Sequence, residues 1–169
     1  MWSVRPARPQ DAAAVAGVHV RSWQMGYRGL LPADYLDGLR PEDRMSRYTF
    51  GQSDPDLAST IVAAEDGAIL GFATTGPSSA DEAEGRGELF ALYVDPDAWG
   101  RGVGRRLMAE ARARLAGQRF TEAVLWVLVG NVRAERFYVA DGWVSDDQQR
   151  RQEIWGVAVD ETRYRRRLP

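Results

Sequence analysis

Three glycines at alternate positions, Gly100, Gly102 and Gly104, separate an apolar stretch from a segment with helical periodicity. Glycines at such a junction let the backbone approach a ligand closely, and the N–H groups of the helix N-terminus point out of the helix. That terminus carries a partial positive charge that suits a phosphate or pyrophosphate group. Arg101 and Arg105 add full positive charges around it. These residue types and their spacing predict a phosphate-binding loop at the start of a helix.

Two well-known phosphate-binding motifs do not fit this loop. A Walker loop needs a lysine, and all 22 basic residues of the chain are arginine. A dinucleotide-binding fingerprint needs Gly-x-Gly-x-x-Gly and an acidic residue about 20 positions further on. Here the spacing is Gly-x-Gly-x-Gly, and the following strand is expected to end in Val129-Gly130-Asn131. Neither motif explains the loop.

Composition narrows the remaining classes of protein. The chain has 169 residues, of which 44% are hydrophobic, and this fits a single domain covering 1–169. Its net charge of −2 gives no reason to expect nucleic acid as a partner. No cysteine is present, so disulfides and thiolate catalysis are excluded. His19 is the one histidine, which leaves no histidine cluster for a metal ion, and it is predicted to have a structural role.

No feature of the sequence indicates a membrane or an export route. The chain has no apolar run of the ~20 residues that a membrane-spanning helix needs. Its first residues lack the apolar core of a signal peptide. We therefore expect a cytoplasmic protein without a membrane partner.

Apolar periodicity predicts the elements that must position the loop. Residues of strand-like length and pattern predict strands at 4–7, 60–64, 69–74, 88–94 and 123–129. Helical spacing predicts helices at 12–23, 33–39, 103–117 and 131–140, and a turn or two of helix at 41–48.

Turn signals predict how these elements are connected. Asp66-Gly67 between two apolar runs is typical of a tight hairpin. The polar segment 77–87 predicts a surface loop. Strands at 154–159 and 162–168 are expected to close the fold as a hairpin around Asp160-Glu161. The order of elements predicts an α/β (α+β) fold with a mixed sheet covered by helices, in which 88–129 forms a parallel strand-helix-strand crossover.

Two segments of the chain resemble one family. The loop Trp99-Gly100-Arg101-Gly102-Val103-Gly104 is similar to the acyl-CoA pyrophosphate loop of the GCN5-related N-acetyltransferases, whose usual pattern is Gln/Arg-x-x-Gly-x-Gly/Ala. Trp99 stands where that pattern has Gln or Arg. The segment from Asn131 to Trp143 resembles the family's Asn-x-x-Ala-x-x-Phe-Tyr-x-x-x-Gly-Phe/Trp pattern. The resemblance implies the family's acyl-CoA acyltransferase fold, with a mixed, mostly antiparallel central sheet flanked by helices.

The resemblance also implies acetyl-CoA as the acetyl donor and no metal ion. In the family, the pantetheine arm pairs with the strand before the loop, and one backbone N–H there polarises the thioester carbonyl. The residues implied to contact acetyl-CoA are Leu92, Tyr93, Val94, Trp99, Gly100, Arg101, Gly102, Val103, Gly104, Arg105, Asn131 and Tyr138.

Two residues are candidates for proton transfer. The family's tyrosine at the position of Tyr138 lies near the thioester sulfur, where its phenol can protonate the departing thiolate. The alternative is that Tyr138 only packs at the edge of the core. Glu88 opens the strand before the loop and is a candidate general base acting through water, and the alternative is a solvated carboxylate at a strand start. No covalent acetyl-enzyme is expected, because the chain has no cysteine and no serine with an activating base.

The acceptor site is predicted between the early helices and the closing hairpin. Candidate residues there are Trp23, Tyr27, Leu31, Tyr35, Glu153 and Trp155, although the aromatic ones could equally pack the helices onto the sheet. The predicted function is direct acetyl transfer to the primary amine of a small molecule, such as an amino acid, an amine or an antibiotic-like compound. A protein or peptide N-acetyltransferase and a non-catalytic acyl-CoA-binding module are the alternatives. Similar proteins are often dimers, so a homodimer stays open.

Overall fold

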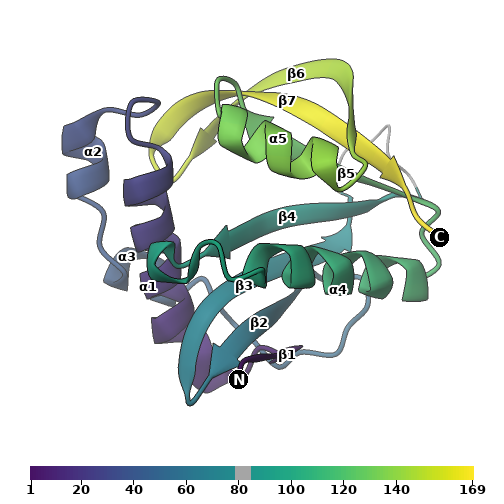
Figure 1. Cartoon of the computed structure of the whole chain (residues 1–169), viewed down its shortest axis with the longest axis horizontal. Coiled ribbons are helices and arrows are strands. Elements are labelled where there is room, and N and C mark those ends of the chain that lie inside the picture. The colour runs from purple at the N-terminus through teal and green to yellow at the C-terminus, as the bar shows by residue number, and fades with distance from the viewer. Residues whose placement is uncertain (79–84) are drawn as a thin grey trace.

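A central sheet organises the computed structural model, which describes residues 1–78 and 85–169. In these residues the sheet has seven strands, in the spatial order β1-β2-β3-β4-β5-β7-β6 (Figure 1). Their bounds are Ser3–Pro6 for β1, Ser59–Glu65 for β2, Ala68–Pro77 for β3, Gly87–Val94 for β4, Glu122–Leu128 for β5, Val144–Ile154 for β6 and Val157–Arg167 for β7.

The pairing of the strands confirms the predicted mixed, mostly antiparallel sheet. Neighbouring strands run antiparallel except for β4 and β5, which are parallel, as predicted for the crossover at 88–129. The parallel pairing is short, because it consists of Gly87 with Ala123 and Glu88 with Val124. Beyond Glu88 the two central strands are no longer paired, and the sheet opens between them.

Helices cover both faces of this sheet. Helix α1 (Ala12–Gly26), with the short helices α2 (Ala33–Asp37) and α3 (Glu42–Met45), covers one face, and α4 (Val103–Gly117) and α5 (Val132–Ala140) cover the other (Figure 1). Because strand side chains alternate, β2 serves two cores: Ile61 and Ala63 pack with α4, and Val62 packs with α1. Short 3-10 turns at Pro9–Asp11 and Pro96–Ala98 precede α1 and the glycine loop.

Local irregularities shape the sheet near its opening. The predicted hairpin at Asp66-Gly67 is confirmed, and both turn residues have the positive φ that such a turn needs, 49° and 86°. Thr74 pairs with Ala91 whereas Thr75 pairs with Leu89, so Phe90 is an extra residue in β4. Such a bulge bends its strand and turns the following backbone. It lies just before the part of β4 that faces the opening.

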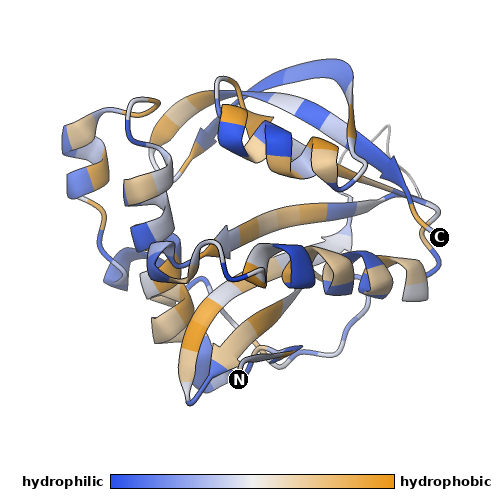
Figure 2. Cartoon of the chain, in the orientation of Figure 1, coloured by the Kyte–Doolittle hydropathy of each residue, from blue (hydrophilic) through white to orange (hydrophobic). Residues whose placement is uncertain are grey.

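The predicted closing hairpin is wrong in its turn and its first strand. The turn is Trp155-Gly156, and Asp160-Glu161 lies inside β7. Strand β6 at the sheet edge is mostly exposed and hydrophilic (Figure 2), so it lacks the apolar alternation that identifies a strand from sequence.

Two further expectations concern loops and membranes. Strand β3 continues to Pro77 and β4 begins at Gly87, while residues 79–84 of the predicted surface loop lie outside the described residues. Among the helices that the structure describes, none combines the length and the apolar character needed to cross a membrane.

Candidate active site

The glycine loop has the backbone geometry of an anion site. Gly100 and Gly102 have φ of 79° and 81°, a conformation that other residues rarely adopt, and Gly102 stands directly before the first helical residue of α4. Gly104 lies within α4, where an added Cβ would come 3.4 Å from the Phe137 ring. The first N–H groups of α4 have no partner within the helix and are therefore free to bind a phosphate.

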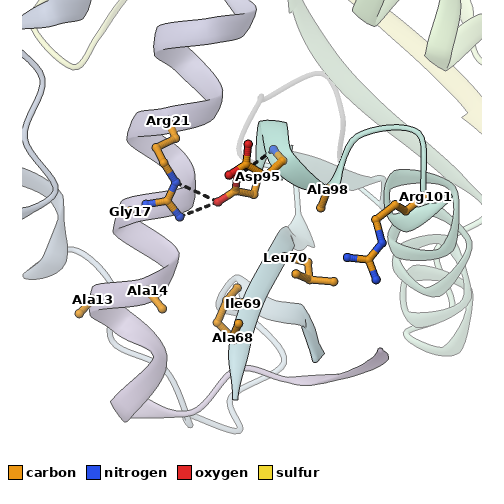
Figure 3. A pocket seen from close by; sticks show the side chains of 11 residues that line it. Ala13, Ala14, Gly17, Arg21, Ala68, Ile69, Leu70, Asp95, Ala98 and Arg101 are labelled. Carbon is orange, nitrogen blue, oxygen red and sulfur yellow. Dashed lines mark hydrogen bonds and ion pairs between the residues drawn. The ribbon is translucent and has the colours of Figure 1, made fainter. Parts of the chain in front are cut away.

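An ion pair from α1 holds the turn that leads into this loop. Arg21 donates from Nε and Nη2 to Asp95 Oδ2, at 2.9 and 2.6 Å (Figure 3). Asp95 also accepts from the backbone N–H of Asp97 at 3.1 Å and so caps the 3-10 turn. A small cavity of about 390 Å³ lies beside the ion pair, between α1 and the start of β3.

The side chain of Arg101, a predicted contact of acetyl-CoA, lines that small cavity (Figure 3). Its guanidinium donates to both carboxylate oxygens of Glu65, at 2.8 and 3.0 Å. This pairing directs the charge of Arg101 away from the glycine loop. Arg105, one turn further along, lines the main cavity instead.

The main cavity occupies the opening between β4 and β5. Its volume is about 790 Å³, which is large enough for an extended cofactor arm and a small second ligand. Apart from Arg101, every residue predicted to contact acetyl-CoA lines it: Leu92, Tyr93, Val94, Trp99, Gly100, Gly102, Val103, Gly104, Arg105, Asn131 and Tyr138.

Trp99 links the loop to the strand before it. Its indole Nε1 donates to the carbonyl oxygen of Val94 at 2.9 Å. The guanidinium of Arg133 on α5 lies 3.5 Å from the centre of one face of the indole, which is a cation–π contact. Trp99 therefore joins β4, the loop and α5 at the point where the family pattern has a polar side chain.

Helix α5 brings Asn131 and Tyr138 to the cavity. Asn131 caps the helix, since its Oδ1 accepts from the N–H of Ala134 at 3.2 Å. Tyr138 packs edge-on against Phe137 and Trp143. Burial raises the pKa of Tyr138 well above its usual range, so its hydroxyl is protonated at neutral pH and can donate to a ligand in the cavity.

Glu88 is buried at the point where β4 and β5 separate, with only 5% of its surface exposed. Ser78 Oγ donates to its Oε1 at 2.9 Å. Burial raises the pKa of Glu88 above its usual range, and the Ser78 hydrogen bond and the charge of Arg150 oppose that shift. A carboxyl group with a raised pKa, facing a cavity, suits a general base.

Sequence reasoning missed a second carboxylate near Glu88. Glu161 on β7 is buried, lines the cavity and accepts from Arg150 Nε at 2.9 Å. Its negative charge contributes to the raised pKa of Glu88. The sequence analysis placed Glu161 in a turn. The inward-facing alternation of Val157, Val159 and Glu161 along one strand would have identified it.

The predicted acceptor residues divide into three groups. Trp23, Tyr27 and Leu31 line the cavity. Tyr35 and Trp155 pack behind its wall, where the Tyr35 hydroxyl donates to the carbonyl oxygen of Trp155 at 2.5 Å. Glu153 is exposed on β6 and does not line the cavity.

Three further side chains line this end of the cavity: His19, Tyr48 and Arg44. His19 Nδ1 and the Tyr48 hydroxyl are 2.5 Å apart, and the imidazole stacks on the Tyr93 ring at 4.9 Å. Burial lowers the pKa of His19 to about 3, so it is neutral at physiological pH. Arg44 comes from α3, a single turn of otherwise exposed residues, which gave the sequence analysis no signal.

In residues 1–78 and 85–169, no group of three or more histidine, aspartate or glutamate side chains is arranged to hold a metal ion.

Comparisons with known proteins agree with this fold and cavity. A model of the acetyltransferase (GNAT) family matches residues 20–143. The uncharacterized N-acetyltransferase YuaI of Bacillus subtilis is 31% identical over 132 residues, which are 78% of this chain and 74% of YuaI. An uncharacterized N-acetyltransferase of Archaeoglobus fulgidus is 33% identical over 139 residues, which are 81% of this chain and 89% of that protein. The PaiA N-acetyltransferase of Thermoplasma acidophilum, crystallised with coenzyme A, has a TM-score of 0.75 at 19% identity, over 99% of both chains.

The fold, the opened sheet and these matches define the class of the protein as an N-acetyltransferase. More particularly, the chain belongs to the acetyltransferase (GNAT) family. Both segments that predicted the family, the glycine loop and 131–143, lie inside the matched range.

Proposed function

We propose that the protein transfers the acetyl group of acetyl-CoA directly to the primary amine of a small molecule. The observation that carries this proposal is the continuity of the main cavity. One cavity contacts the N-terminus of α4, the carboxyl group of Glu88 and the aromatic side chains of α1. Donor and acceptor can therefore be bound together, which direct transfer requires.

The donor is proposed to bind along β4 and the loop. Its pyrophosphate meets the free N–H groups of α4, and Arg105 adds positive charge there. Its pantetheine arm enters the opening of the sheet and pairs with the backbone of Leu92 to Val94, after the bulge at Phe90. The coenzyme A in the crystal structure of the Thermoplasma acidophilum protein supports this choice of donor.

The transfer step moves protons at the acceptor nitrogen and at the departing sulfur. Glu88, acting through water, removes a proton from the acceptor ammonium, which is the main form of an amine of pKa about 10 at neutral pH. The neutral amine attacks the thioester carbon, so that a C–N bond forms and the C–S bond breaks. A backbone N–H of β4 stabilises the oxyanion, and the Tyr138 hydroxyl protonates the departing thiolate. The attacking nitrogen loses its second proton through water as the C–S bond breaks, and this proton restores the Tyr138 hydroxyl.

The lining of the acceptor end supports a small acceptor over a protein. Trp23, Tyr27 and Leu31 lie on one continuous cavity with Glu88, and most of these side chains are buried. Buried side chains such as these fit a ligand of small-molecule size, whereas a polypeptide needs an open groove. A protein or peptide N-terminus stays the alternative acceptor.

The proposal is tested by acetyl-CoA-dependent thiol release with a panel of amino acids, polyamines, aminoglycosides and short peptides. The protein has no cysteine, so it adds no thiol background. We expect release with at least one class of small amine and none with peptides. Release with peptides alone would replace the small acceptor by a protein. Coenzyme A binding without release for any amine would support a binding module and overturn the proposal.

A further inference from the structure

An arginine without an acidic partner lies at the acceptor end of the cavity. Arg44 lines the cavity, and its guanidinium carbon lies 4.4 Å from the centre of the Trp155 ring. Within the part of the chain that the structure describes, its side chain has no ion pair or hydrogen bond, and its Nε is buried without a partner. Arg44 is half-buried, and even partial burial of a charge without a counter-ion is costly, so such a group is more typical of a ligand site than of a structural contact.

The surroundings of Arg44 do not neutralise its charge. The groups that act on it most strongly are the tyrosines Tyr48, Tyr93 and Tyr35 and the like charge of Arg47, while burial lowers the pKa of Arg44. His19 is neutral and has a buried Nε2 without a partner among the described residues. A partly desolvated guanidinium held over an aromatic ring is suited to bind a planar carboxylate through two hydrogen bonds.

The other end of the acceptor space carries the opposite charge. Glu88 and Glu161 are both buried there. Arg150 pairs with Glu161, and Arg163, the other cation that acts on Glu88, is paired with Asp146. Tyr93 lines the same cavity and its ring stacks on His19, and the charges of both Glu161 and Arg44 act on its pKa. The acceptor space is therefore negative on the side of the proposed base and positive at α3.

We propose that the acceptor is a zwitterion of the amino-acid class, whose carboxylate binds Arg44 while its ammonium faces Glu88. This inference rests on the proposed function, and it narrows the acceptor from any small amine to an amine that also carries a carboxylate. Polyamines and aminoglycosides lack that carboxylate, and a peptide N-terminus has an amide in its place. Arg44 is then the residue that determines acceptor specificity.

The wild-type protein is tested with matched acceptors. Each common L-amino acid except cysteine is compared with its carboxamide and its decarboxylated amine in the thiol-release assay, and β- and γ-amino acids test the spacing of the two charges. We expect kcat/KM to be at least about 10-fold higher for the carboxylates than for their neutral analogues. Equal rates for both would overturn the role of Arg44 and leave the proposed function intact. If none of these acceptors, and none in the panel above, gives thiol release, the proposed function itself is overturned.

The variant Arg44→Gln tests the residue. For the best amino acid we expect KM to rise about 10-fold or more, with the rate for its carboxamide and the KM for acetyl-CoA unchanged, and with partial recovery in Arg44→Lys. Arg47→Gln is the matched control, since Arg47 is an exposed arginine on the same segment that does not line the cavity. An unchanged preference for carboxylates in Arg44→Gln would overturn the proposal. If that variant does not fold, the wild-type comparison decides.

Discussion

At the scale of single residues, the proposed mechanism depends on how burial changes the pKa of two proposed proton-transfer groups. Burial raises the pKa of both Glu88 and Tyr138, but the consequences differ. A raised pKa makes the Glu88 carboxylate a better acceptor of a proton from an ammonium. The same effect keeps Tyr138 protonated, and burial in one cavity also raises the pKa of a departing thiolate. The pair therefore suits one proton removal and one proton donation.

Glu88→Gln should lower kcat about 100-fold at saturating acceptor, because the base is lost. In the wild type, kcat should rise with pH through the raised pKa of Glu88 and then level off, since the base acts as the carboxylate. The variant should lack this rise. Tyr138→Phe should lower kcat at every pH but should keep the rise of kcat with pH. A full pH profile of kcat for the three proteins makes this comparison, and an unchanged rise in Glu88→Gln would remove Glu88 from the mechanism.

The charged Glu88 should also destabilise the folded protein at neutral pH. Its pKa is higher in the folded than in the unfolded protein, so its effect on stability is favourable below the unfolded pKa and is lost as pH rises through the folded pKa. Glu88→Gln should therefore unfold at a higher urea concentration than the wild type near pH 7.5. The difference should disappear below the usual carboxyl pKa. A lower midpoint for the variant at pH 7.5 would show that the carboxylate is stabilising instead.

At the scale of elements, the loop between β4 and α4 carries the proposed donor site. Arg21 and Asp95 fix the turn before it, and Trp99 fixes the loop to the end of β4. Gly102 contributes a backbone shape that a side chain disfavours, whereas Gly104 has ordinary helical geometry.

Gly102→Ala should raise the KM for acetyl-CoA several-fold, because alanine at φ 81° costs about 1 kcal/mol and distorts the N–H groups of the loop. Gly104→Ala is the matched control. Its added Cβ would meet Phe137 at 3.4 Å, and alanine favours a helix, so we expect a small change in KM. Initial rates measured over a range of acetyl-CoA concentrations give the KM of each variant. Equal KM values for both variants would mean that the conformation of Gly102 does not determine donor binding.

At the scale of the whole molecule, sequence predicted the residues that line the proposed donor end of the cavity better than those that line the acceptor end. The glycine loop and Asn131 lie in one strand-helix junction each, so local pattern was sufficient to place them. Arg44 and Glu161 reach the cavity only through the packing of α3 and the pairing of β7 with β5. Local sequence carries no such information, and β6, polar and at the edge, gave no strand signal.

The position of the Arg101 side chain also depends on a contact between distant parts of the chain. Its position in the motif predicted a phosphate contact, but Glu65 at the end of β2 attracts its guanidinium to the other side of the loop. Pairing between segments far apart in the chain decided where this side chain lies. The family and the fold followed from the two motifs, whereas the acceptor end required the three-dimensional structure.

The central claim is that donor and acceptor occupy one cavity together and react directly. The most direct test is the initial rate of thiol release measured while acetyl-CoA and the best acceptor are varied against each other. Our account predicts double-reciprocal plots whose lines intersect, as a ternary complex requires. Parallel lines, which indicate a covalent acetyl-enzyme, would contradict it.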